Sequence, residues 1–86
     1  MRELIWHVYL LECSDGTYYC GITQEMDTRL ARHNGALPGG AKYTATRRPV
    51  RLLVSKACTS KSEALKLERA VKAQPRAKKI LLLQAP

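Results

Sequence analysis

Five polar side chains in this sequence are of the types that hydrolyse phosphodiesters: Tyr9, Tyr19, Arg29, His33 and Glu68. An arginine guanidinium donates paired hydrogen bonds to a phosphate and stays charged. A histidine can move a proton near neutral pH, and a single carboxylate can hold a Mg²⁺ ion whose other ligands are water and phosphate oxygens. Together these residue types could carry out phosphodiester chemistry, provided that the fold brings them together.

Each of these residues also has an ordinary structural explanation. Arg29 and His33 are four residues apart on a predicted helix, beside its apolar stripe, so they could line a groove between helix and sheet or simply face solvent. Glu68 lies at the edge of another apolar stripe, where it could pair with Lys72 one turn later or hold Mg²⁺. Tyrosine is common in strands because it packs well there. No single residue therefore decides the question.

Both tyrosines lie in a predicted β-hairpin that runs from His7 to Thr23. Apolar and aromatic runs flank Ser14-Asp15-Gly16, and Asp-Gly between such runs is a strong hairpin signal. A two-residue loop would place Tyr9 and Tyr19 on opposite faces of the sheet. A three-residue loop with Gly16 in the left-handed conformation would place them on the same face. The sequence permits either loop.

The remaining chain completes the pattern of one small domain, residues 1–86. The predicted strands are Ile5–Glu12, Thr17–Ile22 and Val50–Cys58, and the predicted helices are Gln24–Asn34, a helix that starts at Ser60 and ends before Pro75, and Arg76–Gln84. Ser60 and Glu63 fit a helix-capping box. Ala36–Arg48 is predicted to be a loop because it contains Pro38-Gly39-Gly40. The order β-β-α-β-α-α indicates an α+β fold in which helices flank a small three-stranded antiparallel sheet.

Composition narrows the partners and the compartment. The formal net charge of +8 favours binding to a polyanion, most commonly nucleic acid. The alternative is a basic protein whose charge only keeps it soluble. Cys13, Cys20 and Cys58 are odd in number and lack zinc-site spacing, so a reducing cytoplasm is the simplest environment. The apolar run Leu4–Leu11 is too short to span a membrane and has no signal-peptide cleavage region. A cytoplasmic protein that binds nucleic acid and no membrane is expected.

Taken in order, the short motifs resemble those of the GIY-YIG nuclease family, and most closely its small single-domain bacterial members. The matching positions are Val8-Tyr9-Leu10, Tyr19-Cys20-Gly21, Arg29, His33 and Glu68. The similarity extends from about His7 to Lys72 and includes Gly21-Ile22-Thr23, the pair His33-Asn34 and the segment Ala41-Lys42-Tyr43-Thr44.

This resemblance implies a DNA endonuclease that uses one divalent metal ion, Mg²⁺ or Mn²⁺. By analogy with the family, Glu68 holds the metal and Arg29 stabilises the charge that develops on the scissile phosphate. Tyr9, Tyr19 and His33 orient or deprotonate the attacking water. Both tyrosines must then share one face of the sheet, which favours the three-residue loop.

Three positions depart from the family pattern. His7 stands where the first motif usually has glycine, and Cys20 stands where the second usually has isoleucine. Some relatives have an asparagine after the glutamate, but here no asparagine follows Asn34. Glu68 is therefore the one evident metal ligand, and weak metal affinity is expected without DNA.

Further residues are candidates for contacts with DNA: Lys42, Tyr43, Arg47, Arg48, Arg51 and Lys72, with Lys78 and Lys79 near the C-terminus. Contacts with the phosphate backbone give salt-sensitive binding with little sequence preference. With no appended specificity domain, cleavage of single-stranded or branched DNA in repair, recombination or processing is expected. The alternatives are a non-catalytic binding module and a nuclease subunit that needs a protein partner; the sequence leaves the oligomeric state open.

Overall fold

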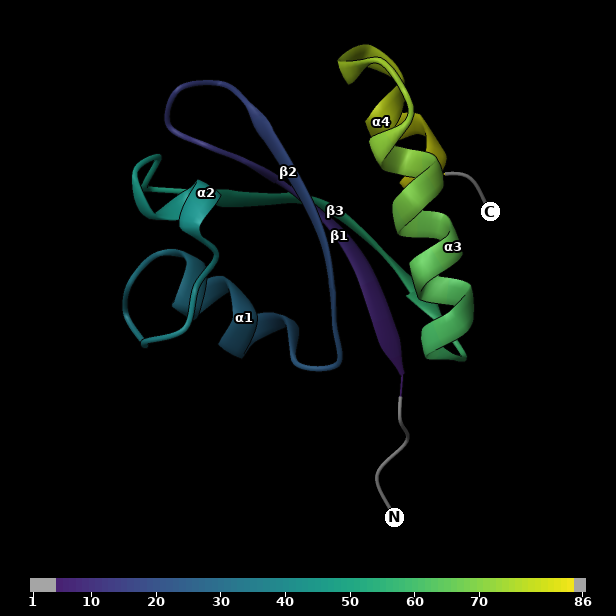
Figure 1. The fold of residues 1–86 in the computed structure, drawn as a ribbon, viewed down its shortest axis with the longest axis horizontal. Helices are drawn as coiled ribbons and strands as arrows, with labels where there is room; N and C mark the ends of the chain where they lie inside the picture. The colour runs from purple at the N-terminus through teal and green to yellow at the C-terminus, as the bar shows by residue number, and fades with distance from the viewer. Residues whose placement is uncertain (1–4, 85–86) are drawn as a thin grey trace.

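A central antiparallel sheet separates two pairs of helices in the computed structural model, which describes residues 5–84 (Figure 1). The strands are β1 (Trp6–Glu12), β2 (Tyr18–Thr23) and β3 (Arg51–Cys58), and the helices are α1 (Met26–His33), α2 (Lys42–Ala45), α3 (Lys61–Lys72) and α4 (Arg76–Gln84). The strand order is β2-β1-β3, so β2 is an edge strand. The predicted α+β class and three-stranded antiparallel sheet are confirmed. Residues 1–4 and 85–86 of the predicted domain lie outside the described residues.

The prediction of a plain loop over Ala36–Arg48 is wrong at one place, because α2 forms a single helical turn there. The Ala45 amide donates to the Ala41 carbonyl at 3.2 Å, which closes this turn. Four residues are too few to show an apolar period of 3.6, so the pattern gave no helix signal. The other predicted elements are present, with ends that differ by no more than two residues.

The hairpin has the three-residue loop. The Cys13 amide donates to the Thr17 carbonyl at 2.8 Å, the Gly16 amide donates to the Cys13 carbonyl at 2.9 Å, and Gly16 has φ of 82°. The resulting register pairs Tyr9 with Gly21 and Leu11 with Tyr19. Residues that face each other across a ladder share a face, as do alternate residues of one strand. Tyr9 and Tyr19 therefore lie on the same face of the sheet.

Each face of the sheet carries its own hydrophobic cluster. One cluster contains Val8, Leu10 and Cys20, packed against residues of α3 and α4. The other contains Tyr9 and Leu11, packed against residues of α1. The tyrosine face therefore lies against α1, while α3, which carries Glu68, covers the opposite face.

Local chemistry fixes the start of α3 and the end of α1. The Ser60 hydroxyl accepts a hydrogen bond from the Glu63 amide at 3.1 Å, and this N-cap starts α3 as predicted. Gly35, with φ of 82°, follows the C-cap of α1, a conformation that glycine adopts without strain. This sharp end fixes the position of His33, the last residue of α1.

Candidate active site

His33 lies at the centre of the site and is completely buried. Its Nε2 atom is 2.8 Å from the Tyr9 hydroxyl, and its Nδ1 atom is 2.9 Å from the Thr44 hydroxyl. The Tyr19 ring lies beside it, with ring centroids 5.2 Å apart. The interpretation of His33 as a surface histidine is therefore wrong. The closing turn of α1 and the one-turn helix α2 enclose the imidazole against the tyrosine face.

The side chains of Asn34 and Arg48 hold the backbone around His33. Asn34 donates to the Val50 carbonyl at 2.9 Å and accepts from the Val50 amide at 2.7 Å, which ties the end of α1 to the residue before β3. Arg48 donates through Nε to the His33 carbonyl at 2.7 Å. A carbonyl at a helix C-terminus needs such a donor. Arg48, predicted as a DNA contact, is exposed and also supports the site through this bond.

Arg29 lies one helical turn before His33 and reaches the same hydroxyl. Its Nε–H donates to the Tyr9 oxygen at 3.4 Å, and its Nη1 donates to the Gly39 carbonyl at 2.9 Å. Of the five N–H donors in a guanidinium, these bonds use two. The remaining donors are the ones that a phosphate could occupy.

Gly21 explains how the Tyr9 hydroxyl can cross the neighbouring strand. A Cβ atom on Gly21 would lie 2.6 Å from Cζ of Tyr9, which is closer than real Cβ contacts come. Only glycine leaves room for the tyrosine ring over β2. Gly21 of the second motif therefore provides the space that the side chain of Tyr9, in the first motif, occupies.

Burial sets the protonation states of the central pair. It lowers the pKa of His33 to about 4, with further contributions from the positive charges of Arg29 and Arg48. It also raises the pKa of the Tyr9 phenol, and this effect outweighs the opposing hydrogen bond and charge of Arg29. Near neutral pH the protein without substrate therefore holds a neutral imidazole against a protonated phenol.

The low pKa of His33 predicts a pH-dependent stability. An unfolded histidine has a pKa of about 6.5, so the unfolded chain binds a proton at this position before the folded chain does as the pH falls. The contribution of neutral His33 to the free energy of unfolding is fully present above pH 6.5 and is lost as the pH falls toward 4. The difference between the two pKa values corresponds to a loss of about 3 kcal/mol. Urea denaturation of the wild type and of His33→Gln at both pH values measures the difference that His33 causes.

The control for that experiment is His7→Gln, which removes the other histidine of the chain. If His33→Gln retains the full loss of stability at low pH while His7→Gln abolishes it, the assignment to His33 is wrong.

An aromatic row leads from His33 toward the surface. The rings of Tyr19 and Tyr43 are stacked with centroids 5.8 Å apart, and the Arg47 guanidinium lies 3.9 Å from the centre of the Tyr43 ring. Asp15 in the hairpin loop holds Arg47 through a 3.1 Å ion pair. The Tyr19 hydroxyl makes no hydrogen bond within residues 5–84 and is thus available to a water or a phosphate oxygen.

The remaining basic candidates differ in how far they are already engaged. Arg51 pairs with Glu12 at 2.7 Å and is largely exposed. Lys79 donates to the carbonyls of Val71 and Lys72, both at 3.1 Å, and so caps the end of α3. Lys42 on α2 and Lys78 on α4 are exposed.

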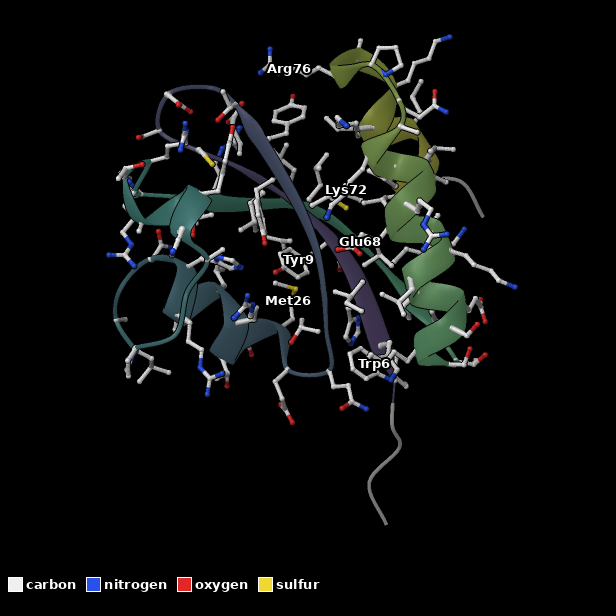
Figure 2. The ribbon with its side chains drawn as sticks, in the orientation of Figure 1. Trp6, Tyr9, Met26, Glu68, Lys72 and Arg76 are labelled. Atoms are coloured by element: carbon white, nitrogen blue, oxygen red, sulfur yellow. The ribbon has the colours of Figure 1, made fainter. Side chains whose placement is uncertain are left out.

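Glu68 stands apart from the other four predicted catalytic residues. Its carboxylate forms a 3.4 Å ion pair with Lys72, as one of the two alternatives predicted, and its side chain is only 18% exposed. Burial and the negative charge of Glu68 raise the pKa of Cys20, a β2 residue, to about 11. In Figure 2 the carboxylate points from α3 toward β2, which passes between it and Tyr9. The structure therefore gathers Tyr9, Tyr19, Arg29 and His33, and places Glu68 across the edge strand.

A divalent ion could use only this carboxylate among the candidate catalytic residues. Residues 5–84 contain no cluster of three or more His, Cys, Asp or Glu side chains able to hold a metal. Mg²⁺ often keeps several waters and takes one or two carboxylates together with substrate phosphates. A lone, half-buried glutamate beside an edge strand fits that pattern, with Lys72 occupying the carboxylate when no ion is present. The residues thus fit a weakly held ion that depends on substrate oxygens.

The fold and the site define a class: a small α+β domain in which an arginine on helix α1 contacts a buried tyrosine–histidine pair beside an edge strand. Residues 5–80 match the family model of the GIY-YIG catalytic domain. The chain belongs to the GIY-YIG family, whose members are generally nucleases that act on DNA.

Individual relatives are small proteins of similar length. The chain is 49% identical to a UPF0213 protein of Cupriavidus pinatubonensis over 78 residues, which cover 91% of this chain and 84% of that protein. It is 49% identical to a UPF0213 protein of Halobacterium salinarum over 73 residues, covering 85% and 92%. The solution structure of a UPF0213 protein from Bacillus halodurans matches with a TM-score of 0.56 at 44% identity, covering 91% of this chain and 81% of that one.

No helix within residues 5–84 combines the length and the apolar character needed to cross a membrane.

Proposed function

We propose that this protein is a divalent-metal-dependent endonuclease that hydrolyses phosphodiesters in single-stranded or branched DNA. The observation that carries the proposal is the buried hydrogen bond between Tyr9 and His33, with Arg29 on the same hydroxyl. A protein that only binds DNA needs positive charge at its surface. It has no need for a neutral acid–base pair beneath an arginine that retains free donors.

The proposed proton path starts at the attacking water. The water gives a proton to the Tyr9 oxygen while the Tyr9 proton passes to Nε2 of His33, and the resulting hydroxide forms the new bond to phosphorus. The oxygen that leaves takes a proton from solvent. Arg29 holds the phosphate through its remaining N–H groups, where negative charge increases in the transition state. A divalent ion held by Glu68 would supply Lewis-acid stabilisation of the phosphate and the leaving oxygen.

The pKa values explain why this path needs the substrate. The pKa of Tyr9 lies above its usual value near 10, and that of His33 is about 4. Both shifts oppose proton transfer from Tyr9 to His33 while no phosphate is bound. A phosphate bound at Arg29 opposes the positive charge that depresses the pKa of His33. We therefore expect the pair to become active only when a phosphate is bound.

The positive surface supports DNA as the partner. The net charge of +8 and the exposed Lys42 next to the aromatic row favour a strand that follows α2 toward Arg29. Tyr43 and Arg47 lie along this path. Binding through such contacts depends strongly on salt and reads little sequence. Repair, recombination or processing of DNA are settings in which single-stranded or branched substrates occur.

The compartment proposed for this activity is the cytoplasm. The three cysteines, Cys13, Cys20 and Cys58, are all buried free thiols, which a reducing compartment preserves.

The position of Glu68 favours a second candidate. Its carboxylate pairs with Lys72 and lies across β2 from Tyr9. If Glu68 serves only in this ion pair and holds no metal, the catalytic site lacks its divalent ion. Such a protein would be a nucleic-acid-binding module, or a nuclease subunit that a partner protein completes.

One experiment separates these possibilities. Labelled single-stranded, duplex and branched DNA are incubated with the protein and Mg²⁺ or Mn²⁺, with EDTA as the control, and both binding and cleavage are measured. We expect metal-dependent cleavage of the single-stranded or branched substrates. Binding without cleavage under any metal would support the binding module, and cleavage only after addition of a second protein would support the subunit.

A further inference from the structure

The Thr44 hydroxyl has two polar neighbours and one proton. It is fully buried on α2, where Oγ1 lies 3.0 Å from the Ala41 carbonyl oxygen and 2.9 Å from Nδ1 of His33. The hydroxyl donates its proton to the Ala41 carbonyl, an oxygen that only accepts hydrogen bonds and that also accepts one from the Ala45 amide at 3.2 Å. The oxygen of Thr44 must then accept from His33. This requires the imidazole proton to be on Nδ1.

The donors and acceptors of the hydrogen bonds between Arg29, Tyr9 and His33 follow from this protonation state. In a neutral imidazole with Nδ1 protonated, Nε2 is bare and accepts. Tyr9 therefore donates its hydroxyl proton to Nε2 across the 2.8 Å contact. Arg29 has no acceptor atoms, so its Nε–H donates to the Tyr9 oxygen. The hydrogen bonds run in one direction from Arg29 through Tyr9, His33 and Thr44 to the Ala41 carbonyl.

We propose that Thr44 is the positioning residue that fixes His33 in the Nδ1-protonated tautomer, and that it thereby makes His33 the acceptor of the Tyr9 proton. In the other tautomer His33 would donate to Tyr9, and the phenol proton would have no acceptor in the site. The consequence for cleavage rests on the proposed function, whereas the tautomer itself does not.

Thr44 performs this task without adding charge. In many histidine sites a carboxylate accepts from the second ring nitrogen, which also favours the protonated imidazolium. Here a neutral hydroxyl, itself held by a backbone carbonyl, accepts that bond instead. The low pKa of His33 agrees with the absence of a carboxylate partner. The site thus keeps a neutral acceptor for a proton at neutral pH.

The loop before α2 is built to hold Thr44 in this place. A Cβ atom on Gly40 would lie 2.9 Å from the carbonyl carbon of Arg32, so only glycine lets the loop pack on the last turn of α1. The Gly39 carbonyl accepts from Arg29 at 2.9 Å. The two ends of the hydrogen-bonded chain, Arg29 and Thr44, are therefore anchored by the same loop.

The tautomer can be measured by NMR of the histidine ring nitrogens in ¹⁵N-labelled protein, without any DNA. The variants are Thr44→Val, which keeps the shape and removes the hydroxyl, and Thr44→Ser, which restores the hydroxyl. We expect the wild type and Thr44→Ser to show protonated Nδ1 and bare Nε2 on His33. Thr44→Val is expected to shift His33 toward the Nε2-protonated form, while the ring of His7 serves as the internal reference.

A wild-type spectrum with Nε2 protonated would overturn the proposal, even if Thr44→Val failed to fold. An unchanged tautomer in a folded Thr44→Val would overturn it as well. Where cleavage is measurable, Thr44→Val should lower kcat by about 10- to 100-fold with little change in KM, and Thr44→Ser should restore it to within a few fold. If the wild type cuts no DNA, the proposed function is wrong, but the NMR spectra still test the tautomer independently.

Discussion

Replacement of Tyr9 by phenylalanine is expected to lower the single-turnover rate of DNA cleavage by about 10²- to 10⁴-fold, the range that general acid–base groups contribute. The hydroxyl that the variant removes is the one shared by His33 and Arg29. Without it, the attacking water has no route for its proton to the buried imidazole. DNA binding should persist, because the surface charges are unchanged.

The same variant should still fold. It leaves Nε2 of His33 buried without a partner, which costs about 1–3 kcal/mol. Urea denaturation measures this loss and separates it from the loss of activity. Tyr18→Phe is the matched control, since Tyr18 is the neighbour of Tyr19 on β2 and packs with the opposite cluster under Arg76. Equal losses of cleavage in the two variants would contradict the role of Tyr9.

Glu68→Gln is expected to reduce metal-dependent cleavage by at least about 10²-fold, because a bound divalent ion supplies several kcal/mol of charge stabilisation in the transition state. Binding measured in EDTA should be retained. Glu63→Gln removes the same charge from the same helix and is the matched control; glutamine keeps an acceptor for the Thr59 hydroxyl, which now donates to Glu63 at 3.0 Å.

A third variant distinguishes a metal ligand from an ion pair. Lys72→Met breaks the 3.4 Å contact with Glu68 but leaves the carboxylate in place. At saturating protein it should cut at a rate within a few fold of the wild type and need less metal, because Lys72 no longer competes for the carboxylate. If Lys72→Met loses cleavage as fully as Glu68→Gln, then Glu68 acts through its ion pair and the metal assignment is wrong.

The sheet and the longer helices could be predicted from the sequence because their signals are local. Asp15-Gly16 between apolar runs indicated the hairpin, and Ser60 with Glu63 indicated the start of α3. The face shared by Tyr9 and Tyr19 could not be predicted from local pattern, since it depends on whether the loop has two or three residues. The resemblance to a family favoured the loop that the structure has.

The surroundings of His33 could not be predicted from helix position. Its burial requires α2, whose four residues carry no periodic signal, and the close approach of the loop at Gly40. Thr44 and Asn34 belonged to segments that resemble the family, but nothing in their residue types separated them from ordinary polar residues. The charge of Arg48 indicated a DNA contact, which stays a prediction, but nothing in the sequence indicated that its Nε also donates to the His33 carbonyl. Long-range contacts, rather than local propensity, decide such roles.

The predicted site is thus divided by the sheet. The tyrosine face supplies the pair of Tyr9 and His33 with Arg29, and α3 supplies Glu68 from the other side of β2. Because β2 is an edge strand, a DNA strand could reach both sides around it without entering the core. This arrangement is consistent with the proposed substrate, a DNA with an unpaired or branched strand.

The most direct test of this account is a single-turnover experiment on a preformed complex. Protein in excess is bound to end-labelled branched or single-stranded DNA in EDTA, excess Mg²⁺ is added, and product is followed with time for the wild type and Tyr9→Phe. The account predicts that the wild type cuts after Mg²⁺ is added and that Tyr9→Phe, equally bound, is slower by about 10²-fold or more. No product from the bound wild type with Mg²⁺ or Mn²⁺, or equal rates for the two proteins, would contradict it.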